Sequence, residues 1–137
     1  MHNQSVTRKG PRGFSLVELM VTVAILGIVA GVAVPSYVEH VRKGKRADAQ
    51  QYMMALAQLN QQRFLDQRSY TDNLSSLLAV PASVSPNYTV AITTADGPPR
   101  SFSITATPTG DQLKDSCGTL TLTSANVKSS SSGTKCW

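Results

Sequence analysis

The chain has 137 residues, and its composition is ordinary for a globular protein apart from low charge, so one folded domain is expected. The formal net charge is +5, but Arg8, Lys9 and Arg12 carry three of these charges. Without residues 1–13, ten basic and eight acidic residues leave a net charge of +2. Net charge by itself is therefore no argument for nucleic-acid binding.

A long apolar run follows the basic N-terminal segment. The segment ends at Gly13, and the run extends from Phe14 to Val34 with few polar interruptions. About 20 apolar residues cross the hydrocarbon core of a bilayer as a helix. The run is longer than the apolar region of a cleaved secretory signal and continues into a second helical pattern. We therefore expect it to be retained as a membrane helix.

The orientation of this helix does not follow from counting basic residues, because they flank the run on both sides. Residues 1–13 are too short to fold, and the cysteine pair near the C-terminus favours an oxidising compartment. We therefore expect a cytoplasmic N-terminus and place the bulk of the chain outside the membrane.

Glu18 is the acidic residue of the apolar run. A carboxylate at the centre of a membrane helix costs about 2.5–3.5 kcal/mol, and less near the interface. One interpretation is an interfacial acid favoured by the helix dipole. The other is that Glu18 pairs with a cation. Cleavage just before Phe14 would supply one as a new α-amino group, on the same chain or on a neighbour.

Beyond Pro35 the pattern predicts an amphipathic helix that ends near residues 66–68, before a loop with a short helical turn. The basic cluster at residues 42–46 either contacts anionic lipid headgroups or forms a solvated turn of helix. The apolar face of the helix comprises Val38, Val41, Ala49, Tyr52, Leu56, Leu59 and Phe64.

Alternating sequence predicts three strands, at residues 88–94, 101–107 and 119–124, with a turn at 96–100. Each strand has one apolar face, which the amphipathic half of the helix would cover. This is an α+β architecture. The Ser-rich tail would be flexible alone, and a Cys117–Cys136 disulfide would hold it against the third strand. Two free cytosolic thiols are the alternative.

The sequence offers no catalytic constellation, phosphate-binding loop or metal-ligand spacing, so we expect neither an enzyme nor a cofactor. His2 lies in the N-terminal segment, and His40 is expected at the surface. A basic and aromatic group near the C-terminus could bind DNA phosphates and stack a base. It consists of Lys114, Lys128, Lys135 and Trp137. Asp111 and Asp115 offset two of these lysines, which favours a solvated loop.

The leader ending in Gly13, followed by FSLVEL at residues 14–19, resembles the class III signal of type IV pilins. The segment CGTLTLTSANVK and the final CW resemble the end of PilE-type minor pilins. The resemblance implies that a prepilin peptidase cleaves after Gly13 and methylates Phe14. It also implies that Glu18 pairs with the N-terminus of a neighbouring subunit during assembly.

The resulting expectation is a type IV pilin fold with three parts: a cleaved leader (1–13), a transmembrane and filament-core helix (14–35) and a periplasmic, then extracellular, domain (36–137). The expected function is that of a structural pilus subunit, most like a minor pilin. It would support pilus biogenesis, adhesion, twitching motility or DNA uptake. The expected partners are other pilins, the prepilin peptidase and the inner-membrane assembly platform.

Three alternatives remain at this point. A pilus-displayed DNA-uptake receptor is the first. A pseudopilin of a type II secretion system is the second, although major pseudopilins usually carry a calcium site where this chain has cysteines. A membrane-anchored enzyme is the third, and the lack of a catalytic constellation disfavours it.

One prediction concerns the stretch between Gly27 and Pro35. Proline removes a helical hydrogen bond, and Gly27, Gly31 and Pro35 recur along one stripe. In assembled pili of the family this stretch tends to lose helical structure. We expect the same here in a filament only, with helix retained in the isolated subunit. A filament map that resolves unbroken helix through these residues would contradict the prediction.

Overall fold

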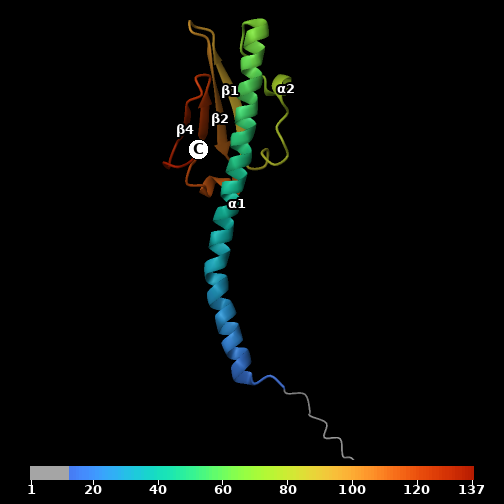
Figure 1. The fold of residues 1–137 in the computed structure, drawn as a ribbon, viewed down its shortest axis with the longest axis vertical. Helices are drawn as coiled ribbons and strands as arrows, with labels where there is room; N and C mark the ends of the chain where they lie inside the picture. Colours follow the sequence, from blue (N-terminus) through green and yellow to red (C-terminus); the bar gives the residue numbers. More distant parts are fainter. Residues whose placement is uncertain (1–12) are drawn as a thin grey trace, which may run out of the picture. The chain divides into compact units, whose positions relative to one another are not determined.

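The computed structural model describes residues 13–137, which divide between Tyr37 and Val38 into two units. Most of the expected leader, including His2 and the three basic residues before Gly13, lies outside the described residues. Helix α1 (Leu16–Gln67) contributes residues to both units. It begins just after the N-terminal segment and ends where the sequence predicted (Figure 1).

Within the second unit, α1 buries one stripe of side chains at steps of three or four residues, as an amphipathic helix requires. The expected Ala49, Tyr52 and Leu56 are buried. Val38 and Val41 remain 38% and 37% exposed, so the prediction that they share the core face was wrong. The buried stripe consists of Arg46, Ala49, Tyr52, Met53, Leu56 and Asn60.

The sheet contains four antiparallel strands in the order β1-β2-β3-β4. Their bounds are β1 Tyr88–Ala95, β2 Ser101–Pro108, β3 Leu120–Thr123 and β4 Lys128–Ser130. The three predicted strands are confirmed. The fourth was missed, because its sequence has no alternation of apolar and polar residues. Backbone pairing joins it to β3, with Leu120 opposite Ser130 and Leu122 opposite Lys128.

The core lies between the second half of α1 and one face of the sheet (Figure 1). Alternate residues of β1, β2 and β3 are buried, as in β2, where Phe102, Ile104 and Ala106 face inward. Burying one large apolar side chain stabilises the fold by about 1.5–3 kcal/mol. Ile92, Ile104 and Leu122 lie opposite one another across β1, β2 and β3 and belong to this core.

A buried asparagine fastens the segment after α1 to the helix. The Asn60 side-chain amide donates to the carbonyl of Thr71 at 3.1 Å, and its oxygen accepts from the Thr71 N–H at 3.0 Å. The hydroxyl of Tyr52 donates to the carbonyl of Leu78 at 2.8 Å. These bonds flank the short helix α2 (Leu74–Leu77), which is the helical turn that the sequence predicted.

Candidate assembly helix and receptor surface

The N-terminal part of α1 presents an apolar surface on all sides. Every residue from Phe14 to Val38 is exposed, and Phe14 itself is 79% exposed. In the part of the chain that the structure describes, α1 is the helix that is long and apolar enough to cross a membrane. Such a surface is unfavourable in water. It requires burial in a bilayer or against other chains.

Glu18 lies in the first turn of α1, inside this apolar surface. The helix dipole favours an acid at this position. Thr22 donates its hydroxyl hydrogen to the backbone carbonyl of Glu18 at 2.7 Å, so this bond does not involve the Glu18 carboxylate. Among residues 13–137, none of the ion pairs includes Glu18.

The helix continues through Pro35 in this isolated chain, as expected. A side chain added at Gly27 or Gly31 would meet no atom within 4 Å. The two glycines therefore leave open space along the helix, which would permit close approach of another helix. The loss of helix on assembly stays a prediction.

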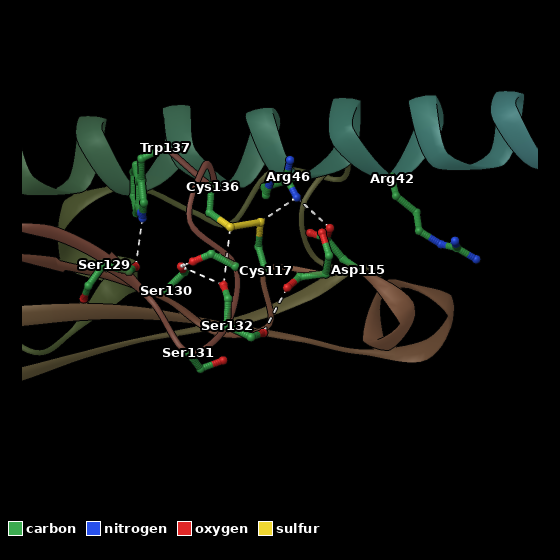
Figure 2. Close-up of a disulfide and its surroundings, with 12 residues drawn as sticks. Arg42, Arg46, Asp115, Cys117, Ser129, Ser130, Ser131, Ser132, Cys136 and Trp137 are labelled. Carbon is green, nitrogen blue, oxygen red and sulfur yellow. Dashed lines mark hydrogen bonds and ion pairs between the residues drawn. A yellow bond between two sulfur atoms is a disulfide. The ribbon is translucent and has the colours of Figure 1, made fainter.

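The disulfide between Cys117 and Cys136 is present, as predicted, and lies directly under α1 (Figure 2). It joins residues 19 positions apart, with 5.7 Å between their Cα atoms. It brackets β3 and β4 and thereby holds the Ser-rich tail on the sheet. A loop of this size stabilises a fold by about 3 kcal/mol in the chain-entropy model.

A buried ion pair accompanies the disulfide. Nη1 of Arg46 lies 2.6 Å from Oδ1 of Asp115 and 2.8 Å from Sγ of Cys117 (Figure 2). The Asp115 side chain is fully buried, and that of Arg46 is 11% exposed. Two predictions were therefore wrong. Arg46 is largely buried and does not belong to a solvated or lipid-contacting turn of helix. Asp115 pairs with Arg46 instead of offsetting a lysine.

Two further polar side chains surround this pair. The Tyr88 hydroxyl donates to Oδ2 of Asp115 at 3.3 Å. Nε2 of Gln112 donates to the Tyr88 oxygen and to the carbonyl of Arg42, both at 3.0 Å. Burial, reinforced by the nearby Asp115, raises the pKa of Tyr88 to about 12, although the Gln112 bond and Arg46 lower it in part.

The structure brings together two of the four residues that we expected at a DNA interface. Nζ of Lys128 lies 5.3 Å from the centre of the Trp137 ring, within cation–π range. Nε1 of Trp137 donates to the carbonyl of Ser129 at 2.8 Å, on the side of the disulfide away from Asp115 (Figure 2). Lys135 is exposed in the loop that the disulfide closes.

Lys114 belongs to a different element, the 3-10 helix η1 (Gly110–Lys114), where it pairs with Asp111 at 3.8 Å. The sequence did not predict a second surface contact that involves a basic side chain. The guanidinium of Arg100, in the turn after β1, donates to the carbonyl of Arg68 at the end of α1. Nothing in a single sequence relates these two positions, because they are 32 residues apart and meet only in the folded chain.

An apolar helix with an acid in its first turn, packed through its second half on an antiparallel sheet, defines a type IV pilin. A family model of the prokaryotic N-terminal methylation motif matches residues 8–34. A second model, described as type IV minor pilin ComP, DNA uptake sequence receptor, matches residues 35–121, which is more than half of the chain. The chain therefore belongs to the ComP family of type IV minor pilins.

Similar curated proteins are pilins. The chain is 36% identical over 69 residues to the type IV major pilin protein PilA of Myxococcus xanthus, covering 49% of this chain and 31% of PilA. It is 32% identical over 89 residues to the type IV major pilin protein PilE1 of Neisseria gonorrhoeae, covering 63% of this chain and 41% of PilE1. It thus spans less than half the length of these two relatives. Pilins assemble with other pilin subunits into a pilus.

The buried ion pair generates the first prediction from this site. In the unit Val38–Trp137, Arg46→Met leaves an uncompensated buried carboxylate and Asp115→Asn an uncompensated guanidinium. Each should lower the free energy of unfolding, measured in urea, by about 3–5 kcal/mol. The double variant should lose less than the sum of the two.

The exposed pair Asp111–Lys114 offers a matched control, because its side chains are 88% and 70% exposed. Asp111→Asn with Lys114→Met should change the free energy of unfolding by less than about 0.5 kcal/mol. Additive effects of Arg46→Met and Asp115→Asn would contradict the account of the buried pair.

The raised pKa of Tyr88 generates a second prediction. Below the ordinary tyrosine pKa of 10.0, the hydroxyl is protonated in the folded and the unfolded chain. Between pH 10 and about 12 the unfolded chain loses this proton first, so the free energy of unfolding should fall as pH rises. Urea unfolding across this range measures the fall, and Tyr88→Phe should reduce its slope. An unchanged slope in Tyr88→Phe would show that Tyr88 is not responsible.

Proposed function

We propose that this chain is a minor subunit of a type IV pilus, made as a single-pass inner-membrane precursor with its N-terminus in the cytoplasm. Prepilin peptidase cleaves after Gly13 and methylates Phe14. The assembly platform then transfers the subunit into the filament. The observation that carries the proposal is the exposed apolar N-terminal part of α1, which begins just after Gly13 and Phe14 and holds Glu18 in its first turn.

The physical basis of assembly is an exchange between two apolar surroundings. The N-terminal part of α1 is apolar all round, so it is buried to a similar degree in lipid and against other apolar helices. Shape and small residues then decide helix packing, and the open sides of Gly27 and Gly31 allow a close approach.

Glu18 would supply specificity in this exchange. A carboxylate surrounded by apolar side chains is costly unless it is paired. The α-amino group created at Phe14 by cleavage is the cation that the mature N-terminus would contain. Pairing Glu18 of one subunit with Phe14 of another would set the axial register of the filament.

A second candidate function is DNA capture. The matching family model is described as a DNA uptake sequence receptor. Lys128 beside Trp137, and Arg100 beside Arg68, place cationic groups at the surface of the second unit. Contacts to DNA phosphates would provide affinity. A base stacking on Trp137 would compete with Lys128, which already lies against that ring.

The assembly role of Glu18 is tested by Glu18→Ala. We expect normal insertion into the membrane and normal cleavage, because the substitution removes a charge from an apolar helix. Incorporation into sheared surface filaments, measured by immunoblot against the membrane fraction, should drop strongly.

A matched control is Thr22→Ala, which removes a polar group one turn away that bonds only the backbone carbonyl of Glu18. It should leave incorporation unchanged. Wild-type incorporation of the Glu18→Ala subunit would refute the assembly role of the carboxylate.

The DNA proposal is tested with the unit Val38–Trp137 and duplex DNA at several salt concentrations. Replacing Lys114, Lys128 and Lys135 by alanine should weaken binding and reduce the slope of log affinity against log salt. The expected reduction is about one for each DNA phosphate that the variant no longer neutralises.

The basic residues Lys43 and Lys45 provide the control, because they lie on α1, which carries none of the three replaced lysines. Their replacement by alanine should affect DNA binding much less. Absence of measurable binding by the unaltered unit would dismiss the receptor function for this chain alone.

A further inference from the structure

The two sulfur atoms of the disulfide have different surroundings (Figure 2). Sγ of Cys117 lies 2.8 Å from Nη1 of Arg46, which is a charged N–H donor. Sγ of Cys136 lies 3.4 Å from the carbonyl oxygen of Ser132, which is an acceptor. A charged donor stabilises a thiolate, whereas the lone pairs of a carbonyl oxygen oppose one. When the bridge opens, a negative charge is therefore favoured on Cys117 over Cys136.

The nearby carboxylate of Asp115 does not cancel this difference. One of its oxygens lies 2.6 Å from Nη1 of Arg46. The other accepts from the Tyr88 hydroxyl at 3.3 Å and lies 3.4 Å from Nε2 of Gln112. The negative charge of Asp115 is thus shared among three donors, and Arg46 is the charged side chain that contacts the sulfur of Cys117 directly.

Access from solvent also differs between the two cysteines. Cys136 is 7% exposed, and Cys117 is 2% exposed. A Cβ atom at the exposed Gly133 would lie 2.7 Å from Sγ of Cys136 and 3.6 Å from Sγ of Cys117. Because glycine has no side chain, nothing at this position covers the sulfur of Cys136. The exposed Lys135 next to Cys136 adds positive charge on this side, which favours the approach of an anion.

These two differences decide which sulfur an external thiolate attacks. Thiol–disulfide exchange is faster at the more accessible sulfur, and faster when the departing thiolate is the better stabilised one. Access from solvent selects Cys136 as the point of attack, and the contact with Arg46 selects Cys117 as the departing thiolate. Both criteria therefore give the same direction of exchange.

We infer that Cys136 is a thiol-exchange site, at which an external thiolate forms a mixed disulfide with the chain. The entering sulfur bonds to Sγ of Cys136, the bond to Sγ of Cys117 breaks, and its electron pair remains on Cys117 beside Arg46. The bridge closes by the reverse step, in which the Cys117 thiolate attacks Sγ of Cys136 and releases the external thiolate. Each step replaces one sulfur–sulfur bond by another, so it needs no further oxidant or reductant.

Brief treatment of the full-length chain with reduced glutathione, in detergent micelles, tests the inference. The chain contains two cysteines, and both form the bridge, so every new thiol comes from it. N-ethylmaleimide stops the reaction, and trypsin cleavage after Lys128 separates the two cysteines for mass spectrometry. We expect glutathione on Cys136 and the maleimide on Cys117. This arrangement should exceed the reverse one about tenfold, because a charged donor stabilises the departing thiolate.

The double variant Arg46→Met with Asp115→Asn separates stabilisation of the thiolate from mere shielding of the disulfide. It removes the donor and its counter-charge together. Opening by glutathione should become about tenfold slower, and the preference for Cys136 should fall to what its greater exposure provides. The exposed pair Asp111–Lys114 again supplies a matched control. Asp111→Asn with Lys114→Met should leave both the rate and the preference unchanged.

Three results would overturn the inference. The first is glutathione mainly on Cys117, or equally on both cysteines. The second is a disulfide that glutathione does not open while the domain stays folded, because an exchange site must be reachable. The third is faster opening in the double variant, which would show that Arg46 and Asp115 only shield the bridge. The proposed pilus function would stand in each case, because incorporation into filaments tests it separately.

Discussion

A single helix that must satisfy two different environments is the constraint on which the rest of this molecule depends. From Phe14 to Val38 every side chain of the N-terminal stretch is exposed, and nearly all are apolar, so they require burial by something other than this chain. From Arg46 to Asn60 the same helix has one buried face. The second part therefore supports a folded domain, and we propose that the first part serves assembly. Glu18 is costly only in the first part, and under the proposed function a cation of another subunit would pair with it there.

The domain depends on closing its C-terminal segment against that helix. The short strand β4 has no apolar alternation of its own, so the Cys117–Cys136 disulfide and backbone pairing with β3 hold it. The side-chain amide of Gln50 donates to the carbonyl of Cys136, and Arg46 contacts Cys117 from the same helix. Buried charges are favourable only when paired. Arg46 thus joins Asp115 to the disulfide below α1 (Figure 2). Tyr88 extends this cluster through its bond to the same Asp115.

Local patterns were sufficient to predict β1, β2 and β3, the end of α1 and the disulfide, because each depends on periodicity, turn residues or the count of cysteines. The features that were missed depend on partners distant in sequence. Arg46 belonged to a basic run and gave no sign of burial, because its partner is 69 residues away. Asn60 is a polar residue in the buried stripe of α1, and only its hydrogen bonds to Thr71 explain its burial. Strand β4 forms because it pairs with the backbone of β3, and the residues of β4 alone do not predict this pairing.

The most direct test of this account is the intact mass and N-terminal sequence of the protein from sheared surface filaments. The account predicts a mature chain that begins at methylated Phe14, with a mass two hydrogens below the reduced value because of the disulfide. That result would show a processed subunit in an assembled pilus. A chain found only in the membrane and still beginning at Met1 would contradict the central claim that α1 is released for assembly by cleavage after Gly13.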